Sequence, residues 1–250
     1  MKNKIGWCDM TWNPVWGCRN HCEYCYARKI AKRFRLTMAI KETVYRVEKG
    51  QVKSSELLIE GDKVRDNLGN FNPIFLYSQF NKEFPKKPQR IFVGSMSEIY
   101  YWEKRWIRDT LNKILEYPQH TFQFLTKFPD IYSQWYFHPN CWIGITITKE
   151  ENFIKGIPYD FICSNNITFL SIEPILEKID PNLLNELNIN WVIIGAETGN
   201  RKGRVIPKKE WIEDIVSYCR DKDIPVYLKD SLKEIYPEEI KEFPKGGKIK

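Results

Sequence analysis

The chain has 250 residues, of which 42% are hydrophobic and 28% are charged, a composition that excludes disordered and collagen-like classes of protein. No apolar run approaches the roughly 20 residues of a membrane helix, and the first residues do not lead into an apolar signal core, so we expect a cytoplasmic protein without membrane contact. The formal net charge of +7 favours polyanionic partners but is too small to establish nucleic-acid binding.

The first informative stretch, residues 16–26, reads WGCRNHCEYCY and holds Cys18, Cys22 and Cys25. Gly17 and the polar insert between the first two cysteines favour a loop. The same spacing also places cysteines on one face of a helix, so a buried helical stripe is the alternative. The chain has seven cysteines, and this odd number in a reducing compartment favours metal or catalytic use over a disulfide framework.

Residues 44–87 have a less regular pattern. The charged stretch EGDKVRDNLGN, residues 60–70, contains Gly and Asn and predicts an exposed loop. We therefore expect an irregular insertion at 48–87.

Six apolar, β-branched and aromatic runs, each followed by polar residues, predict β-strands that alternate with helices. The runs are Arg90 to Val93, Thr121 to Leu125, Trp142 to Ile147, Ile167 to Leu170, Trp191 to Ile194 and Pro225 to Leu228. Their continuous hydrophobicity predicts strands covered on both faces. The segments between them are long enough for the crossovers that parallel strands require.

Apolar residues at helical spacing predict helices over 103–117 and 211–219. An open doubly wound sheet fits this alternation, but the polar groups after nearly every strand better fit a barrel whose active face lies at the C-terminal strand ends. The sequence therefore predicts an α/β fold, a full or partial (β/α) TIM-like barrel of about six parallel strands, as a single domain over 1–250. The tail at 237–250 is expected to be a helix fragment and a frayed terminus.

The three clustered thiols have two metal interpretations. A structural zinc site needs four ligands, and no second Cys-x2-Cys pair exists, although Cys8 or His21 could complete the set. An iron–sulfur cube held by three thiolates instead leaves one iron open to another molecule. The second interpretation gives a functional reason for the missing fourth thiol. A zinc-stabilised, non-enzymatic nucleic-acid-binding module stays open as the alternative.

The pattern Cys18-x3-Cys22-x2-Cys25, with Tyr24 directly before the last cysteine, resembles the signature of the radical S-adenosylmethionine superfamily. The resemblance implies a 4Fe-4S cluster on these cysteines and S-adenosylmethionine at the open iron. It implies reductive cleavage of this cofactor to methionine and a 5′-deoxyadenosyl radical, with electrons from a donor such as a flavodoxin or ferredoxin.

A second resemblance covers nearly the whole chain. The motifs TWNPVWGC, FVGSMSEIY, QHTFQFLTK, SIEP, WVIIGAETG and PVYLKD, in this order, are similar to an uncharacterised family of phage and bacterial proteins described as radical-SAM-like. This likeness implies the fold and the cofactor more than it implies a substrate.

The superfamily resemblance also assigns roles after two strands. The turn at 94–98 stands where relatives carry a Gly-Gly-Glu-like turn for the methionyl amino group, so Gly94, Ser95 and Ser97 are expected to contact the cofactor. An ordinary strand-to-helix turn with a serine cap is the alternative. Glu197 belongs to a divergent form of the fifth-strand motif that supports adenine.

Further charged residues follow other strands. Glu173 is placed to bind a ribose hydroxyl or the amino group of the cofactor. Lys127 and Lys229 can hold a carboxylate or a phosphate. A structural ion pair of either lysine with Glu173 or Glu197 is the alternative.

Aromatic residues and the remaining cysteines complete the expected site. Tyr24 is expected near adenine and Tyr26 over the cluster, while Trp12, Asn13 and Trp16 are candidates for the mouth of the barrel. Packing in the core is the alternative for the two tryptophans. The other cysteines that follow the motif are expected to be small buried side chains: Cys141, Cys163 and Cys219.

The leading hypothesis is a radical S-adenosylmethionine enzyme with an unassigned substrate. A nucleic acid or nucleotide is one candidate, because the chain is basic and rich in aromatic residues; a protein or small metabolite is another. A barrel that uses its cluster only for electron transfer is a third hypothesis.

Overall fold

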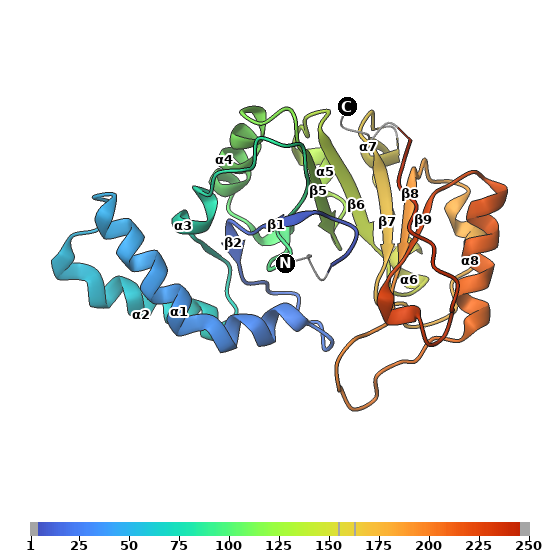
Figure 1. Cartoon of the computed structure of the whole chain (residues 1–250), viewed down its shortest axis with the longest axis horizontal. Helices are drawn as coiled ribbons and strands as arrows, with labels where there is room; N and C mark the ends of the chain where they lie inside the picture. Colours follow the sequence, from blue (N-terminus) through green and yellow to red (C-terminus); the bar gives the residue numbers. More distant parts are fainter. Residues whose placement is uncertain (1–4, 155, 163, 246–250) are drawn as a thin grey trace.

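The computed structural model describes residues 5–154, 156–162 and 164–245. Seven parallel strands form one sheet in the order β1-β4-β5-β6-β7-β8-β9, which curls into a half-barrel (Figure 1). The strands are β1 (Met10–Trp12), β4 (Arg90–Val93), β5 (Thr121–Thr126), β6 (Cys141–Thr146), β7 (Thr168–Ile172), β8 (Trp191–Ile194) and β9 (Val226–Leu228).

This sequential strand order separates a barrel from a doubly wound sheet. A doubly wound sheet reverses its strand order at a switch point, whereas each strand here lies beside the next one in the chain, apart from β2 and β3. The predicted partial barrel is confirmed, and all six predicted strands are present. The seventh, β1, was missed because it spans only 10–12.

The strands are buried on both faces because alternate residues pack in opposite directions. One face packs on α4 (Lys104–Leu115) and α8 (Lys209–Asp221), which lie outside the curled sheet (Figure 1). The other face packs around Trp7, whose ring centroid lies 4.6 Å from that of Phe92. A Cβ atom at Gly144 would lie 2.4 Å from the Phe169 ring, so this close approach requires glycine.

A helical hairpin precedes β4 and projects from the β1 edge of the sheet (Figure 1). It consists of α1 (Tyr26–Glu48) and α2 (Leu57–Asn70), which bury Met38 and Leu68 between them. The exposed loop predicted for 60–70 is therefore wrong. The apolar residues Val64 and Leu68 lie one turn apart and anchor this segment as a helix.

Short elements complete the fold. β2 (Val15–Trp16) pairs antiparallel with β3 (Ile74–Phe75). The short helices are α3 (Tyr77–Phe80), α5 (Ile131–Gln134), α6 (Glu151–Ile154) and α7 (Tyr159–Ile162), and the 3-10 turns are η1 (Ser54–Glu56), η2 (Ile99–Tyr101), η3 (Pro181–Leu184) and η4 (Asp230–Leu232). None of the described helices is both long and apolar enough to cross a membrane.

The described part of the tail covers the edge of β9. The amide of Leu228 donates to the carbonyl of Ile240 (2.9 Å), and the amide of Glu242 donates to that of Val226 (2.9 Å). A helix fragment was predicted here and is not present between 237 and 245. Pairing protects the backbone groups of an edge strand, which explains the extended conformation. The remainder of the expected tail, 246–250, lies outside the described residues.

Candidate functional site

The loop between β2 and α1 holds the three clustered cysteines. It begins at Gly17, whose φ is 104° and where a Cβ atom would lie 2.1 Å from the carbonyl oxygen of Asn72. The amide of Cys18 donates to the carbonyl of Phe71 (2.9 Å), and α1 starts directly after Cys25. The predicted loop is confirmed and the helical stripe is wrong.

Each of the three sulfur atoms accepts a hydrogen bond. The backbone amide of Asn20 donates to Cys18 Sγ and its side-chain Nδ2 donates to Cys22 Sγ, both at 3.3 Å. The amide of Arg28 in the first turn of α1 donates to Cys25 Sγ (3.4 Å). Amide donors stabilise negative charge on sulfur, so the loop is arranged for thiolates.

The donor set fits an iron–sulfur cube. Burial is the main cause that raises the pKa of Cys18 to about 12, and the hydrogen bond from the Asn20 amide opposes this shift. A bound metal would favour the thiolate further. No three His, Cys, Asp or Glu side chains among the described residues are grouped to hold one metal ion. A cube binds each thiolate to a different iron, so three thiols spread along a single loop suit it.

The turn after β4 contacts this loop. The amide of Gly17 donates to the carbonyl of Met96 (3.0 Å), and Tyr26 Oη donates to the carbonyl of Ser95 (2.9 Å).

The two serine hydroxyls of this turn are also hydrogen-bonded. The Ser95 hydroxyl donates to Oδ1 of Asn13 (3.0 Å), and the Ser97 hydroxyl accepts from Trp102 (3.0 Å). Both serines therefore take part in fixing the turn, and contact of Gly94, Ser95 and Ser97 with a cofactor stays a prediction.

Glu98 is a buried carboxylate at the same edge of the sheet. It accepts hydrogen bonds from the Thr126 hydroxyl, from the amide of Lys127 (3.0 Å) and from the amide of Tyr100 (3.5 Å). Burial raises its pKa, which these donors counteract. Glu98 thus fixes the strand end from which Lys127 extends.

The ammonium of Lys127 lies over the Tyr24 ring, 5.5 Å from its centroid. No carboxylate of a described residue lies within ion-pair distance of it. Burial lowers its pKa, while nearby thiols and Glu98 oppose this shift. Burial also raises the pKa of Tyr24, so its phenol stays protonated and can donate a hydrogen bond. The side chain of Lys127 is therefore directed at the cysteine loop, which contains Tyr24.

Glu173 after β7 and Lys229 after β9 form an ion pair. Their side chains are 25% and 17% exposed, so the pair remains within reach of a ligand. A Cβ atom at Gly195 would lie 3.0 Å from Lys229 Cδ and 3.2 Å from Glu173 Cγ. Glycine after β8 therefore makes room for the pair. The ion-pair alternative for Lys229 is confirmed.

Glu197 makes a different contact from the one expected. Its two carboxylate oxygens accept from Arg201 Nε (2.7 Å) and Nη2 (2.8 Å), and Arg201 Nη1 reaches the Glu23 carboxylate (3.1 Å). This hydrogen bonding is the main cause of the lowered pKa of Glu197. The loop after β8 is thereby joined to the cysteine loop, and Figure 1 shows both at the lower edge of the molecule.

Residues expected elsewhere at the site are located as follows. Trp12 is 1% exposed and donates through Nε1 to the carbonyl of Gln79 (3.1 Å), so its predicted place at the mouth is wrong.

The cysteines outside the loop are not part of this site where the structure describes them. Cys8 packs in the interior cluster around Trp7. Cys141 and Cys219 are buried core residues, as predicted. Cys163 lies outside the described residues.

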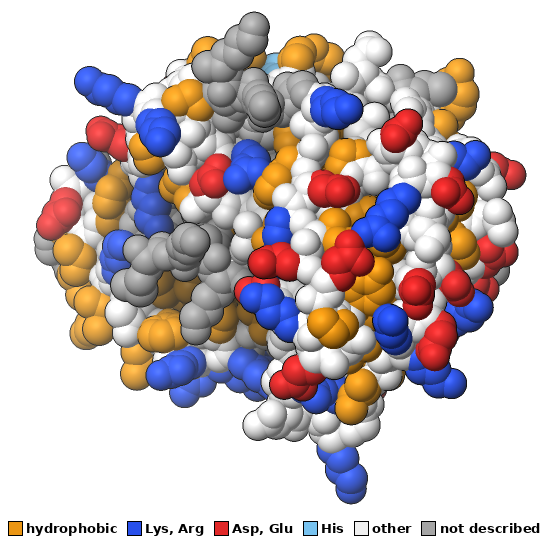
Figure 2. All heavy atoms as spheres, turned by 45° about the vertical axis from the view of Figure 1, so that its right-hand side comes forward, with side chains coloured by type: hydrophobic (Ala, Val, Ile, Leu, Met, Phe, Trp, Pro, Cys, Tyr) orange, Lys and Arg blue, Asp and Glu red, His pale blue; other side chains and the backbone are white. Residues whose placement is uncertain are grey.

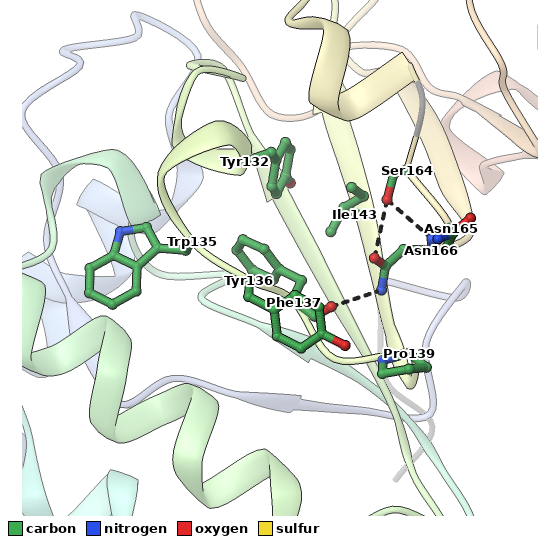
Figure 3. Close-up of a pocket in the computed structure, with 9 residues that line it drawn as sticks. All are labelled: Tyr132, Trp135, Tyr136, Phe137, Pro139, Ile143, Ser164, Asn165 and Asn166. Atoms are coloured by element: carbon green, nitrogen blue, oxygen red, sulfur yellow. Dashed lines mark hydrogen bonds between the residues drawn. The ribbon is translucent and has the colours of Figure 1, made fainter.

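A cavity of about 330 Å³ lies away from this site (Figure 3). Its lining residues come from α5, from β6 and from the segments before β6 and β7. Two of its polar side chains bond to each other and to the backbone: the Ser164 hydroxyl donates to Asn166 Oδ1 (3.1 Å), and Asn166 Nδ2 donates to the carbonyl of His138 (2.7 Å). None of the predicted site residues lines this cavity.

Three residues of the site were not assigned a role from the sequence. Glu98 stands five residues after β4, where a search for carboxylates after each strand would have found it. Asn20 and Arg201 lie in irregular loops, and their contacts depend on how those loops fold. No local pattern indicates such contacts.

Comparison with known families gives one match. The model of the family described as "Protein of unknown function (DUF5131)" matches residues 2–241, and the chain therefore belongs to this family. No curated protein and no solved structure matches the chain.

Proposed function

We propose that this member of the DUF5131 family is a radical S-adenosylmethionine enzyme. The observation that carries the proposal is the cysteine loop at the C-terminal edge of a half-barrel. Three half-buried thiols there each accept a hydrogen bond from an N–H group. Strand-end residues that can bind a charged small molecule follow β5, β7 and β9 at the same edge.

Cys18, Cys22 and Cys25 would hold a 4Fe-4S cluster through three of its irons. When reduced, this cluster supplies the electron that cleaves S-adenosylmethionine to methionine and a 5′-deoxyadenosyl radical. Asn20 and the amide of Arg28 stabilise the negative charge of the thiolates. The three-cysteine set leaves one iron for the cofactor.

The strand ends supply complementary groups for S-adenosylmethionine. The ammonium of Lys127 binds its carboxylate, because this cation has no carboxylate partner among the described residues. Glu173, which is oriented by Lys229, accepts a hydrogen bond from the ribose or from the amino group of the cofactor. The turn of Gly94, Ser95 and Ser97 binds the amino group, and Tyr24 packs near adenine.

The loop after β8 orients the other side of the cofactor. Arg201 binds both the Glu197 carboxylate and the carboxylate of Glu23 in the cysteine loop. These two loops would flank the adenine side of the cofactor, and Tyr26 would lie near the cluster. A flavodoxin or ferredoxin supplies the electron.

Metal analysis tests this proposal against a zinc-stabilised binding module. Protein purified without oxygen should contain about four iron and about four sulfide per chain. The Cys18→Ala, Cys22→Ala and Cys25→Ala variants should lose both. Cys141→Ala is the matched control, since this thiol is buried in the core. Stoichiometric zinc without sulfide would contradict the proposal.

A further inference from the structure

The first half of α1 has an unusual distribution of charge. Residues 26–41 contain no carboxylate but six cations: the half-buried Arg28 and five that are exposed, Lys29, Lys32, Arg33, Arg35 and Lys41. None of these cations forms an ion pair with a described residue. The positive end of the helix dipole lies at the same end, so this arrangement is electrostatically unfavourable in the protein alone.

Other helices of the protein balance their cations. Arg65 in α2 pairs with Asp62, Arg105 in α4 pairs with Asp109, and Lys209 in α8 lies 3.9 Å from Glu213. Because those pairs are three or four residues apart, they stabilise their helices. The cations between residues 28 and 41 of α1 lack such pairs among the described residues, which leaves a positive surface that an external anion can neutralise.

A second group of cations lies across the cysteine loop. Lys202, Arg204 and Lys208 follow β8 and are exposed, and none of them forms an ion pair with a described residue. The Arg201–Glu23 contact ties their loop to the cysteine loop, which leads directly into α1. Figure 2 shows Lys and Arg side chains along the lower edge of the molecule, where Figure 1 places these segments.

Exposed aromatic rings accompany these cations. Tyr26 and Phe34 on α1 are 50% and 42% exposed. Tyr100 is 44% exposed and stacks on Phe128 with ring centroids 4.5 Å apart, directly after Lys127. Cationic grooves with exposed aromatic rings are typical of proteins that bind single-stranded nucleic acid, where bases stack on the rings.

We propose that the enzyme acts on a single-stranded nucleic acid that crosses the cysteine loop between α1 and the loop after β8. This inference rests on the proposed function, because it places the substrate beside the proposed cluster. Lys29 and Arg33 lie one helical turn apart and bind neighbouring phosphates, while Lys202 and Lys208 bind the strand beyond the cluster.

An anionic membrane is the competing partner for a basic helix. Leu36, Ile40 and Val44 of α1 are exposed and would face such a surface. Two observations favour the nucleic acid. The cations gather at the end of α1 that adjoins the cysteines, and they continue on the loop after β8, where Ile206 is the only large apolar side chain among the exposed described residues.

Fluorescence anisotropy on the cluster-loaded protein, without S-adenosylmethionine, tests this inference. The probe is a labelled single strand of about 16 nucleotides. Binding should weaken with salt. The Lys29→Gln/Arg33→Gln variant should bind the strand about tenfold more weakly. The slope of log K against log salt concentration should fall in magnitude by about 1.4, or about 0.7 for each lost phosphate contact. Lys202→Gln/Lys208→Gln should have a similar effect.

Lys222→Gln is the matched control, because Lys222 is exposed at the end of α8 and should leave binding unchanged. The inference is overturned by absent binding at low salt, by equal weakening in the control, or by duplex binding as tight as single-strand binding. If the Lys29→Gln/Arg33→Gln variant loses binding to phosphatidylserine vesicles but binds the oligonucleotide as the wild type does, the inference is also overturned. Binding of the oligonucleotide does not require cleavage of S-adenosylmethionine. A negative binding result would therefore overturn this inference without contradicting the proposed cleavage reaction.

Discussion

The guanidinium of Arg201 lies 3.1 Å from the carboxylate of Glu23 while it also forms two hydrogen bonds with Glu197. One side chain therefore joins the loop after β8 to the loop that carries the cysteines. Glu197 is 6% exposed and depends on Arg201 for compensation of its charge. Glu23 is largely exposed, so the Glu197 contact contributes more to stability.

Removing this guanidinium should destabilise the protein in a pH-dependent way. Arg201→Gln should lower the free energy of unfolding by about 1.5–3 kcal/mol at neutral pH. The pKa of Glu197 is lowered in the folded state, so the stabilisation is present above its unfolded pKa of about 4.3 and is lost as pH falls through the folded pKa.

Urea unfolding at neutral and acidic pH measures this effect. The difference between wild type and Arg201→Gln should shrink below about pH 4.3. Arg105→Gln removes the exposed pair with Asp109 and should cost under about 1 kcal/mol. A difference for Arg201→Gln that stays constant with pH would show that Glu197 does not carry the effect.

Replacing Asn20 by Ala should lower the reduction potential of the cluster. The side chain of Asn20 donates to Cys22 Sγ. Without this donor, the extra negative charge of the reduced cluster is less well stabilised. We expect a shift on the order of tens of millivolts in a titration followed by electron paramagnetic resonance. His21→Asn is the control, since the His21 ring contacts Arg28 and asparagine tolerates its φ of 50°. An equal shift in both variants would count against the role of the amide.

Gly195→Ala should weaken binding of S-adenosylmethionine and leave the cluster in place. The added methyl group would press on Glu173 and Lys229 and displace their ion pair. Equilibrium dialysis with cluster-loaded protein measures the affinity, and iron content checks the cluster. Gly61→Ala is the control, because it lies within α2 with its nearest neighbour at 3.5 Å and should raise stability by about 0.5–1 kcal/mol. Unchanged affinity in Gly195→Ala would remove the pair from the cofactor site.

Lys127→Gln should lower the affinity for S-adenosylmethionine by about 10- to 100-fold, because a charge-assisted hydrogen bond is lost. Lys104→Gln, at the exposed start of α4, should have no effect. The same dialysis experiment compares the two variants. If both bind the cofactor as the wild type does, Lys127 has no role in holding its carboxylate.

The sheet could be predicted because its signal is local. The six predicted strands are rich in apolar, β-branched and aromatic residues, as in Trp191–Ile194, and nearly all of their residues are buried. The helical hairpin had no such signal. In α1, exposed Leu36 and Ile40 blur the boundary between the polar and apolar faces, and α2 contains Gly61 within its helical span.

The candidate site was predictable where its residues directly follow strands. Glu173 and Lys229 are 56 positions apart, yet both stand at C-terminal strand ends, and the sheet brings them together. The link from Arg201 to Glu23 spans 178 positions between two irregular loops. Only the folded path of those loops determines that contact.

Release of 5′-deoxyadenosine tests the central proposal most directly. Cluster-loaded protein, incubated without oxygen with S-adenosylmethionine and a chemical reductant, should form 5′-deoxyadenosine and methionine, measured by mass spectrometry. The Cys22→Ala variant, or omission of the reductant, should prevent it. Absence of both products from a wild-type sample that contains its full complement of iron and sulfide would contradict the proposed enzyme.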